Sequence, residues 1–143
     1  MSSTTSAGQY VEFGIGAENY AIPISEVHEI IRMQDITEIP SGPPYVKGIF
    51  NLRGRIVPVI GLRRLFGLPE EEPDKATRIV VLNHADEFVG IVVDRVNQVV
   101  AIGDIQSPPD RIGGLSGALF TGIGITSSGL VGILKLDEVL LRD

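Results

Sequence analysis

The residues of this sequence that could carry out chemistry are few, and none has the spacing that a catalytic or metal site requires. His28 and His84 are the two histidines, and neither has a partner at metal-ligand spacing. The chain has no cysteine, which excludes disulfides, thiolate ligands and thiol nucleophiles. Ser127 and Ser128 stand in a Gly-flanked turn and lack the G-x-S-x-G pattern of a hydrolase nucleophile. We therefore expect no catalytic residue, no bound metal and no cofactor.

Two further patterns are better explained by local structure than by ligand binding. Gly14-Ile-Gly16 begins like a dinucleotide-binding loop, but Asn19 replaces the third glycine and a strand pattern follows. The acidic run at residues 70–72 is bracketed by Pro69 and Pro73, which is typical of a solvated loop.

Composition excludes several classes of partner. The chain has 143 residues, a formal net charge of −6 and a hydrophobic content of 43%. The negative charge argues against binding nucleic acid through its phosphates, so we expect no nucleic-acid partner. No stretch reaches the roughly 20 apolar residues of a membrane helix, and we expect no direct membrane insertion. Residues 1–8 are rich in Ser and Thr and lack an apolar core, which predicts a flexible tail rather than a secretory signal.

The elements that would position functional side chains are mostly strands. Apolar runs and β-branched residues predict strands at residues 10–15, 78–82 and 89–93. Short helices are predicted near residues 62–66 and 136–141. Residues 25–32 fit either a helix or a strand. Frequent Gly and Pro turn signals between short strands favour small β-barrels over a parallel sheet.

An internal repeat organises these elements. A shift of 69 places residues 21–27 over 90–96 and residues 10–13 over 79–82, and a later shift of 74 places 48–49 over 122–123. The two copies cover about residues 9–68 and 77–142, with about five extra residues near 111–118 and a connector at 69–76. A copy of roughly 60 residues is marginally stable alone, so we expect the copies to share an interface.

Four segments carry a family resemblance. Residues 45–60, Tyr-Val-Lys-Gly-Ile-Phe-Asn-Leu-Arg-Gly-Arg-Ile-Val-Pro-Val-Ile, resemble the Val-Lys-Gly-x-x-Asn-Leu-Arg-Gly-x-x-x-Pro-Val stretch of the chemotaxis coupling protein CheW family. Residues 20–30, 89–96 and the apolar ending 130–140 also resemble the family, and the resemblance spans about residues 9–142. One departure is Gly61, which stands where relatives often carry Asp. The resemblance implies a mainly β chain of two five-stranded SH3-like β-barrels, packed together, with short helices.

The resemblance also implies a function. It implies a cytoplasmic, non-catalytic scaffold at receptor arrays beneath the inner membrane, which links the chemoreceptor cytoplasmic signalling tip to the regulatory domain of the histidine kinase CheA. Two alternatives stay open. One is a coupling domain of a non-flagellar array, such as one that controls surface motility. The other is a small-ligand sensor, which would require polar groups converging on an apolar cleft; we find no such pattern in the sequence.

The partner-binding residues are expected in the two most family-like segments. They are Val27, Glu29, Gly48, Ile49, Asn51, Leu52, Arg53 and Gly54. Val27, Ile49 and Leu52 fit an apolar groove for an amphipathic receptor helix or, equally, the core. Residues 51–54 also read as a hairpin turn between strands 46–50 and 55–60, in which Gly54 suits a left-handed backbone and Arg53 is exposed.

Overall fold

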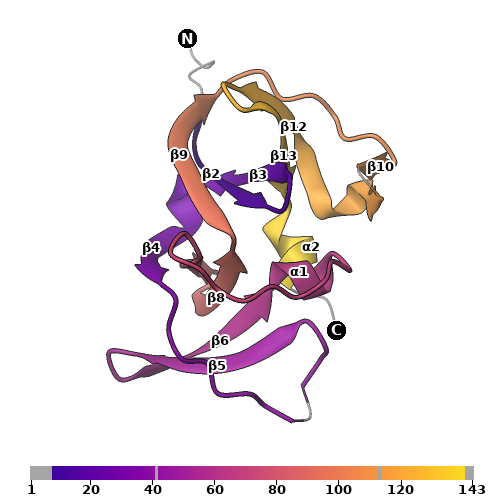
Figure 1. The fold of residues 1–143 in the computed structure, drawn as a ribbon. Coiled ribbons are helices and arrows are strands. Elements are labelled where there is room, and N and C mark those ends of the chain that lie inside the picture. The colour runs from indigo at the N-terminus through magenta and orange to yellow at the C-terminus, as the bar shows by residue number, and fades with distance from the viewer. Residues whose placement is uncertain (1–7, 41, 113, 141–143) are drawn as a thin grey trace. The chain divides into compact units, whose positions relative to one another are not determined.

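The computed structural model describes residues 8–40, 42–112 and 114–140, and the tail predicted at the N-terminus lies outside this range except for Gly8. The chain consists mainly of short strands, with a few single-turn helices (Figure 1). The strands are β2 Gly8–Ile15, β3 Glu18–Pro23, β4 Val27–Arg32, β5 Val46–Leu52, β6 Arg55–Gly61, β7 Arg78–His84, β8 Glu87–Val93, β9 Arg95–Ile102, β10 Arg111–Ile112, β11 Leu115–Ser116, β12 Phe120–Thr126 and β13 Gly129–Leu134. The helices are η1 Ile24–Glu26, α1 Leu62–Leu65, η2 Gly117–Leu119 and α2 Leu136–Leu140.

The local elements follow the sequence pattern closely. The strands predicted at residues 10–15, 78–82 and 89–93 lie within β2, β7 and β8, which confirms them. The helices predicted near 62–66 and 136–141 are α1 and α2, although Leu141 is outside the described residues. The ambiguous segment 25–32 forms the end of the 3-10 turn η1 and then the strand β4, whose residues alternate between partly buried and exposed.

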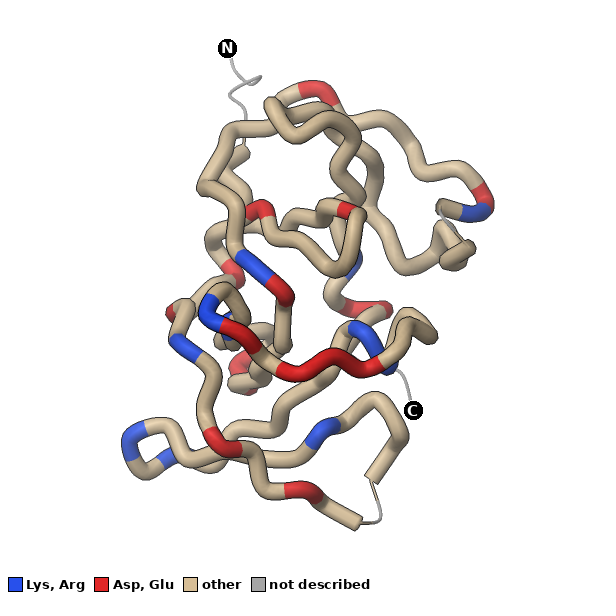
Figure 2. Tube along the Cα trace, in the orientation of Figure 1, with Lys and Arg blue, Asp and Glu red and all other residues tan. Residues whose placement is uncertain are grey.

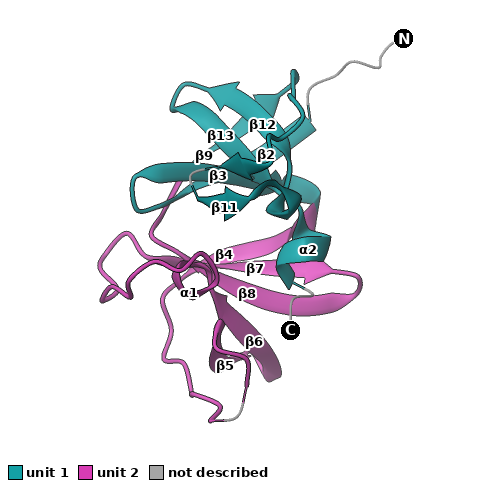
Figure 3. Ribbon diagram, turned by 90° about the vertical axis from the view of Figure 1, so that its right-hand side faces the viewer, with its two compact units in different colours: residues 1–25, 97–143 teal, residues 26–96 magenta. Residues whose placement is uncertain are grey.

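The strands form two five-stranded sheets, each in its own compact unit (Figure 3). Unit 1 comprises residues 1–25 and 97–143, and its sheet has the strand order β12-β13-β3-β2-β9. Unit 2 comprises residues 26–96, and its sheet has the order β4-β7-β8-β6-β5. The predicted mainly β class with two five-stranded sheets and short helices is confirmed.

The two sheets have the same pattern of strand pairing, and each takes strands from both predicted repeats. In each sheet one pair is parallel, β13 with β3 in unit 1 and β6 with β8 in unit 2. The hairpin β2–β3 of the first repeat completes the sheet of β9, β12 and β13, while β7–β8 of the second repeat completes the sheet of β4, β5 and β6. The units therefore do not coincide with the repeats along the sequence.

The expected connector, residues 69–76, does not link the two units. Residues 69–76 do join the two sequence repeats, but they lie inside unit 2, between α1 and β7. The chain passes between the units at Ser25–Glu26 and at Val96–Asn97 instead.

A pair of equivalent bridges brings the edges of each sheet together. In unit 2, Thr37 follows the edge strand β4 and exchanges two backbone hydrogen bonds of 2.9 Å with Ile49 on the other edge strand, β5. In unit 1, Gln106 follows the edge strand β9 and makes the same pair of 2.9 Å bonds with Ile123 on β12. These contacts close each sheet toward a small barrel, since they join strands from opposite edges.

Each barrel is filled by apolar side chains. In unit 2 the core cluster contains Phe50, Leu52, Val57, Val59, Ile79 and Val81. In unit 1 a smaller cluster contains Ala21, Ile102, Val131 and Ile133. Ile60, on β6, is also buried, at 5% exposure. None of the helices in the described part of the chain is long and apolar enough to cross a membrane.

Candidate functional site

The hairpin β5–β6 presents the residues of the most family-like segment. Its two-residue turn, Arg53-Gly54, has φ angles of 49° and 91°, so both central residues are left-handed. This backbone matches the twist of the flanking strands, and it normally favours Asn and Gly. The Asn51 Oδ1 atom accepts a 2.8 Å hydrogen bond from the Gly54 N–H, which fixes the turn. The predicted hairpin and the left-handed Gly54 are confirmed, whereas the left-handed Arg53 was not predicted.

Arg53 forms a two-point ion pair with Glu29 on β4. One guanidinium nitrogen of Arg53 donates to Glu29 Oε1, and the other lies 3.4 Å from Oε2. The Arg53 side chain is 67% exposed and that of Glu29 is 26% exposed. Because β4 and β5 are opposite edges of the same sheet, the pair joins the hairpin turn to the far edge of the unit 2 barrel.

The ion pair stabilises both charges. The hydrogen bond from Arg53 lowers the pKa of Glu29, partial burial opposes it, and the charges of Arg53 and His28 add to the lowering. The hydrogen bond to Glu29 and its charge raise the pKa of Arg53. The two groups are therefore ionised together at neutral pH, and they present a fixed, partly exposed pair of opposite charges.

The other expected partner-binding residues separate into surface and interior positions. Asn51 and Gly54 are exposed beside Arg53, and Val27 is partly buried at the start of β4. Ile49 is partly buried and bonded to Thr37, while Leu52 lies in the unit 2 core cluster. The structure thus brings Glu29, Asn51, Arg53 and Gly54 together, and it places Leu52 inside the barrel.

Gly48 is buried for a steric reason. A Cβ atom at this position would lie 2.1 Å from the carbonyl oxygen of Thr37. Only glycine lets the strand approach Thr37 closely enough to form the Thr37–Ile49 bridge. Gly48 therefore supports the site through the shape of β5.

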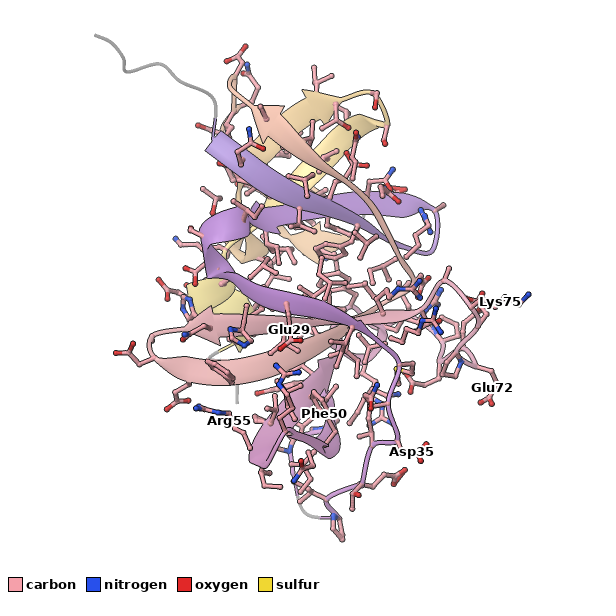
Figure 4. All side chains as sticks on the ribbon, turned by 90° about the vertical axis from the view of Figure 1, so that its left-hand side faces the viewer. Glu29, Asp35, Phe50, Arg55, Glu72 and Lys75 are labelled. Carbon is pink, nitrogen blue, oxygen red and sulfur yellow. The ribbon has the colours of Figure 1, made fainter. Side chains whose placement is uncertain are left out.

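Three residues beside the ion pair were missed by sequence reasoning. The guanidinium carbon of Arg55 lies 4.2 Å from the centre of the Phe88 ring. The His28 ring centre lies 4.6 Å from the same ring, and His28 Nε2 is 3.4 Å from Glu29 Oε1. Phe88 is on β8, which pairs with β6 in parallel. No local sequence pattern predicts the pairing of strands that are so far apart along the chain. In Figure 4 the Arg55 side chain points outward, whereas Glu29 points toward the hairpin.

Unit 2 also contains a cavity of about 220 Å³. Met33, Leu62 and Val92 belong to its apolar lining, and the acidic segment 70–74 passes along it. Figure 2 shows this segment as a nearly continuous red run. The cavity is smaller than the roughly 300–1,000 Å³ of a usual small-molecule site.

Several charged groups around this cavity form ion pairs with one another. Arg63 donates to both carboxylate oxygens of Asp94, at 3.1 and 2.6 Å. Glu70 Oε1 accepts from Lys47 at 3.0 Å and from Arg64 at 3.2 Å. Among the described residues, no group of three His, Asp or Glu side chains is placed to hold a metal ion.

Comparisons with known proteins agree with one another. The family described as the CheW-like domain matches residues 9–143. The chemotaxis protein CheW of Helicobacter pylori is 39% identical over 137 residues, which cover 94% of this chain and 82% of that protein. The chemotaxis protein CheW of Treponema pallidum is 40% identical over 121 residues, covering 80% and 71%.

A solved structure gives the same result for the fold. The crystal structure of the scaffolding protein TtCheW from Thermoanaerobacter tengcongensis superposes with a TM-score of 0.83 at 34% sequence identity. The match covers 91% of this chain and 85% of that one.

Proposed function

Because this chain belongs to the CheW-like family, we propose that it is a scaffold that couples chemoreceptors to the histidine kinase CheA in bacterial chemotaxis. Its partners are the cytoplasmic signalling tip of a receptor and the regulatory domain of the kinase. It acts without catalysis, in the cytoplasm, at receptor arrays. Its similarity to the chemotaxis proteins of Helicobacter pylori and Treponema pallidum and to the scaffolding protein TtCheW supports this role.

The Arg53–Glu29 pair is the single observation that carries the proposed binding surface. It lies at the tip of the hairpin formed by the most family-like segment, and its charges are held in place by two-point contact. A partner that covers the pair removes water from it, which strengthens the attraction between the two charges. Val27, Ile49 and Asn51 extend the proposed contact surface, while Gly48, Leu52 and Gly54 shape the hairpin that presents it.

The two alternatives differ in the support they receive. A small-ligand sensor is not favoured, because the Arg63 and Glu70 groups that line the cavity of about 220 Å³ are engaged in ion pairs. A coupling role in an array that controls surface motility uses the same surface, so it differs only in the identity of the receptor.

The function is tested by reconstitution. We expect the chain, a receptor tip fragment and the kinase to sediment together as a ternary complex. A kinase that sediments equally well with the receptor fragment when the chain is omitted would contradict the coupling role.

The binding surface is tested by three substitutions at one position. Arg53→Ala and Arg53→Asn both remove the guanidinium, but Asn tolerates the left-handed backbone of the turn. We expect each to weaken partner binding about tenfold or more, as arginine hot spots do, with melting temperatures within a few degrees of the parent. Arg53→Lys restores binding in part, because it keeps the charge without the planar fork. Titration calorimetry and thermal melts measure both quantities.

A second substitution, at Glu29, shows whether the lost affinity comes from leaving this carboxylate unpaired. If a partner buries the pair, Arg53→Asn leaves Glu29 buried and unpaired, and the added change Glu29→Gln recovers part of the lost affinity. Unchanged binding of Arg53→Asn to both partners would show that Arg53 is only a solvated turn residue.

A further inference from the structure

Arg55 differs from the neighbouring arginines in its bonding. Arg53 is paired with Glu29, Arg63 with Asp94 and Arg64 with Glu70. Arg55 has no ion pair and no side-chain hydrogen bond to any described residue, and its contact is with the ring of Phe88, 4.2 Å away. Its guanidinium N–H groups are therefore available to a partner.

The contact with Phe88 holds Arg55 in a defined place. Phe88 is partly buried, packs against the unit 2 core cluster and also contacts the His28 ring. A guanidinium that lies over an aromatic ring keeps its N–H edge open while its face is covered. Because part of the side-chain freedom is already lost, less entropy is lost when the edge binds a ligand.

The surroundings of Arg55 favour an acidic ligand. The hairpin tip carries two basic residues and no acidic one between Phe50 and Val57, as the two blue bands at that tip show (Figure 2). Glu29, the carboxylate of β4 that reaches the hairpin, is already engaged by Arg53 through both of its oxygens. One positive charge is left uncompensated at the tip, on a chain whose net charge is −6.

We propose that Arg55, resting on Phe88, binds an acidic side chain of the receptor signalling tip and makes this coupling surface selective for acidic partners. This inference rests on the proposed function and deepens it. The Asp or Glu of the receptor accepts two parallel N–H bonds from the guanidinium edge. The Arg53–Glu29 pair, itself part of the proposed contact surface, fixes the hairpin that presents Arg55 to the partner.

The test titrates full-length variants with a receptor tip fragment and, separately, with the kinase regulatory domain. Arg55→Gln removes the charge, and Phe88→Leu removes the ring but keeps the charge. Arg32→Gln is the matched control, because Arg32 is an exposed arginine at the other end of β4. Arg55→Gln is expected to weaken receptor binding about fivefold or more at low salt, and the deficit shrinks as salt screens the contact. Phe88→Leu gives a smaller loss, and Arg32→Gln none.

A charge swap makes the test specific. Arg55→Glu is expected to abolish most receptor binding, and an Asp or Glu→Lys substitution in the receptor tip restores it for one acidic position. Equal receptor binding by the parent and Arg55→Gln overturns the inference and leaves the scaffold function intact. A loss seen only with the kinase domain also overturns it, because the acidic group then belongs to the kinase. If the parent binds neither partner, the proposed function itself fails.

Discussion

Glu12 is a carboxylate held in the interior of unit 1 by four neutral side chains. It is 0% exposed, and it accepts hydrogen bonds of 2.6 Å from Asn97, Thr126 and Ser128 and of 3.0 Å from Gln98. Burial raises the pKa of Glu12, but the four hydrogen bonds together lower it below its usual value. These donors come from β9, from the end of β12 and from the turn that follows it, so the carboxylate ties β2 to these segments.

Replacing Glu12 by Gln tests this arrangement. The amide nitrogen that replaces one carboxylate oxygen carries two donor hydrogens, and it faces side chains that also donate. Asn97 Nδ2 cannot accept a hydrogen bond in exchange. We expect the free energy of unfolding at pH 7, measured in urea, to fall by about 1–3 kcal/mol. The exposed Glu38→Gln is the control and should change it by less than about 0.5 kcal/mol.

The pH dependence of the same variant has a definite sign. The pKa of Glu12 is lower in the folded chain than in the unfolded one, where it is about 4.3. Its stabilising contribution is therefore complete above that unfolded pKa and is lost as pH falls through the folded pKa. The stability difference between parent and Glu12→Gln should narrow as the pH is lowered from about 5 to about 3. A difference that stays constant over that range would contradict this account of Glu12.

At the scale of residues, neither the Arg53–Glu29 ion pair nor the hydrogen bonds of Glu12 could be predicted from the sequence. Arg53 and Glu29 are both among the predicted partner-binding residues, but their contact depends on β4 and β5 being opposite edges of one sheet. The sequence does not single out Glu12, because a lone acidic residue in an alternating strand is expected to be exposed to solvent. Its donors lie 85 to 116 residues away along the chain, where no local pattern reaches.

At the scale of elements, the close approach of Thr37 to β5 depends on Gly48. The counterpart of Gly48 in unit 1 is Gly122, where a Cβ atom would lie 2.6 Å from the Gln106 carbonyl oxygen. The sequence comparison aligned Gly48 with Gly122 and Ile49 with Ile123, but it could not show that both glycines make room for a barrel-closing bridge. The strands themselves were predictable from apolar runs and turn residues, whereas their pairing was not.

Substitution of Gly48 by Ala measures this close approach. The added methyl group must displace the Thr37 backbone or β5, because both atoms of the Thr37 carbonyl group lie within 2.7 Å of it. We expect the free energy of unfolding to fall by about 1–3 kcal/mol, as for overpacked cores. Gly42→Ala is the matched control, since its nearest contact is Val46 at 4.0 Å. Equal unfolding curves for Gly48→Ala and the parent would contradict the steric role of Gly48.

At the scale of the whole molecule, the exchange of hairpins between repeats decides which pieces can fold. Fragments 1–72 and 73–143 each lack strands from both sheets, whereas residues 26–96 contain all five strands of unit 2. We expect neither half to fold alone, and the fragment 26–96 to give better dispersed amide spectra than either half. Well-dispersed, cooperative spectra from the isolated halves would show that the sheets can be rebuilt within one repeat.

The insertion of unit 2 within unit 1 also sets an order of events during translation. The hairpin β2–β3 leaves the ribosome first, but the strand β13 that pairs with β3 is made about a hundred residues later. At roughly 5–20 residues per second, the edge of β3 stays unpaired for about 5–20 s while unit 2 is completed. Nascent chains that meet one another in that interval expose the same open strand edge, so early aggregation should begin at β2–β3 rather than in unit 2.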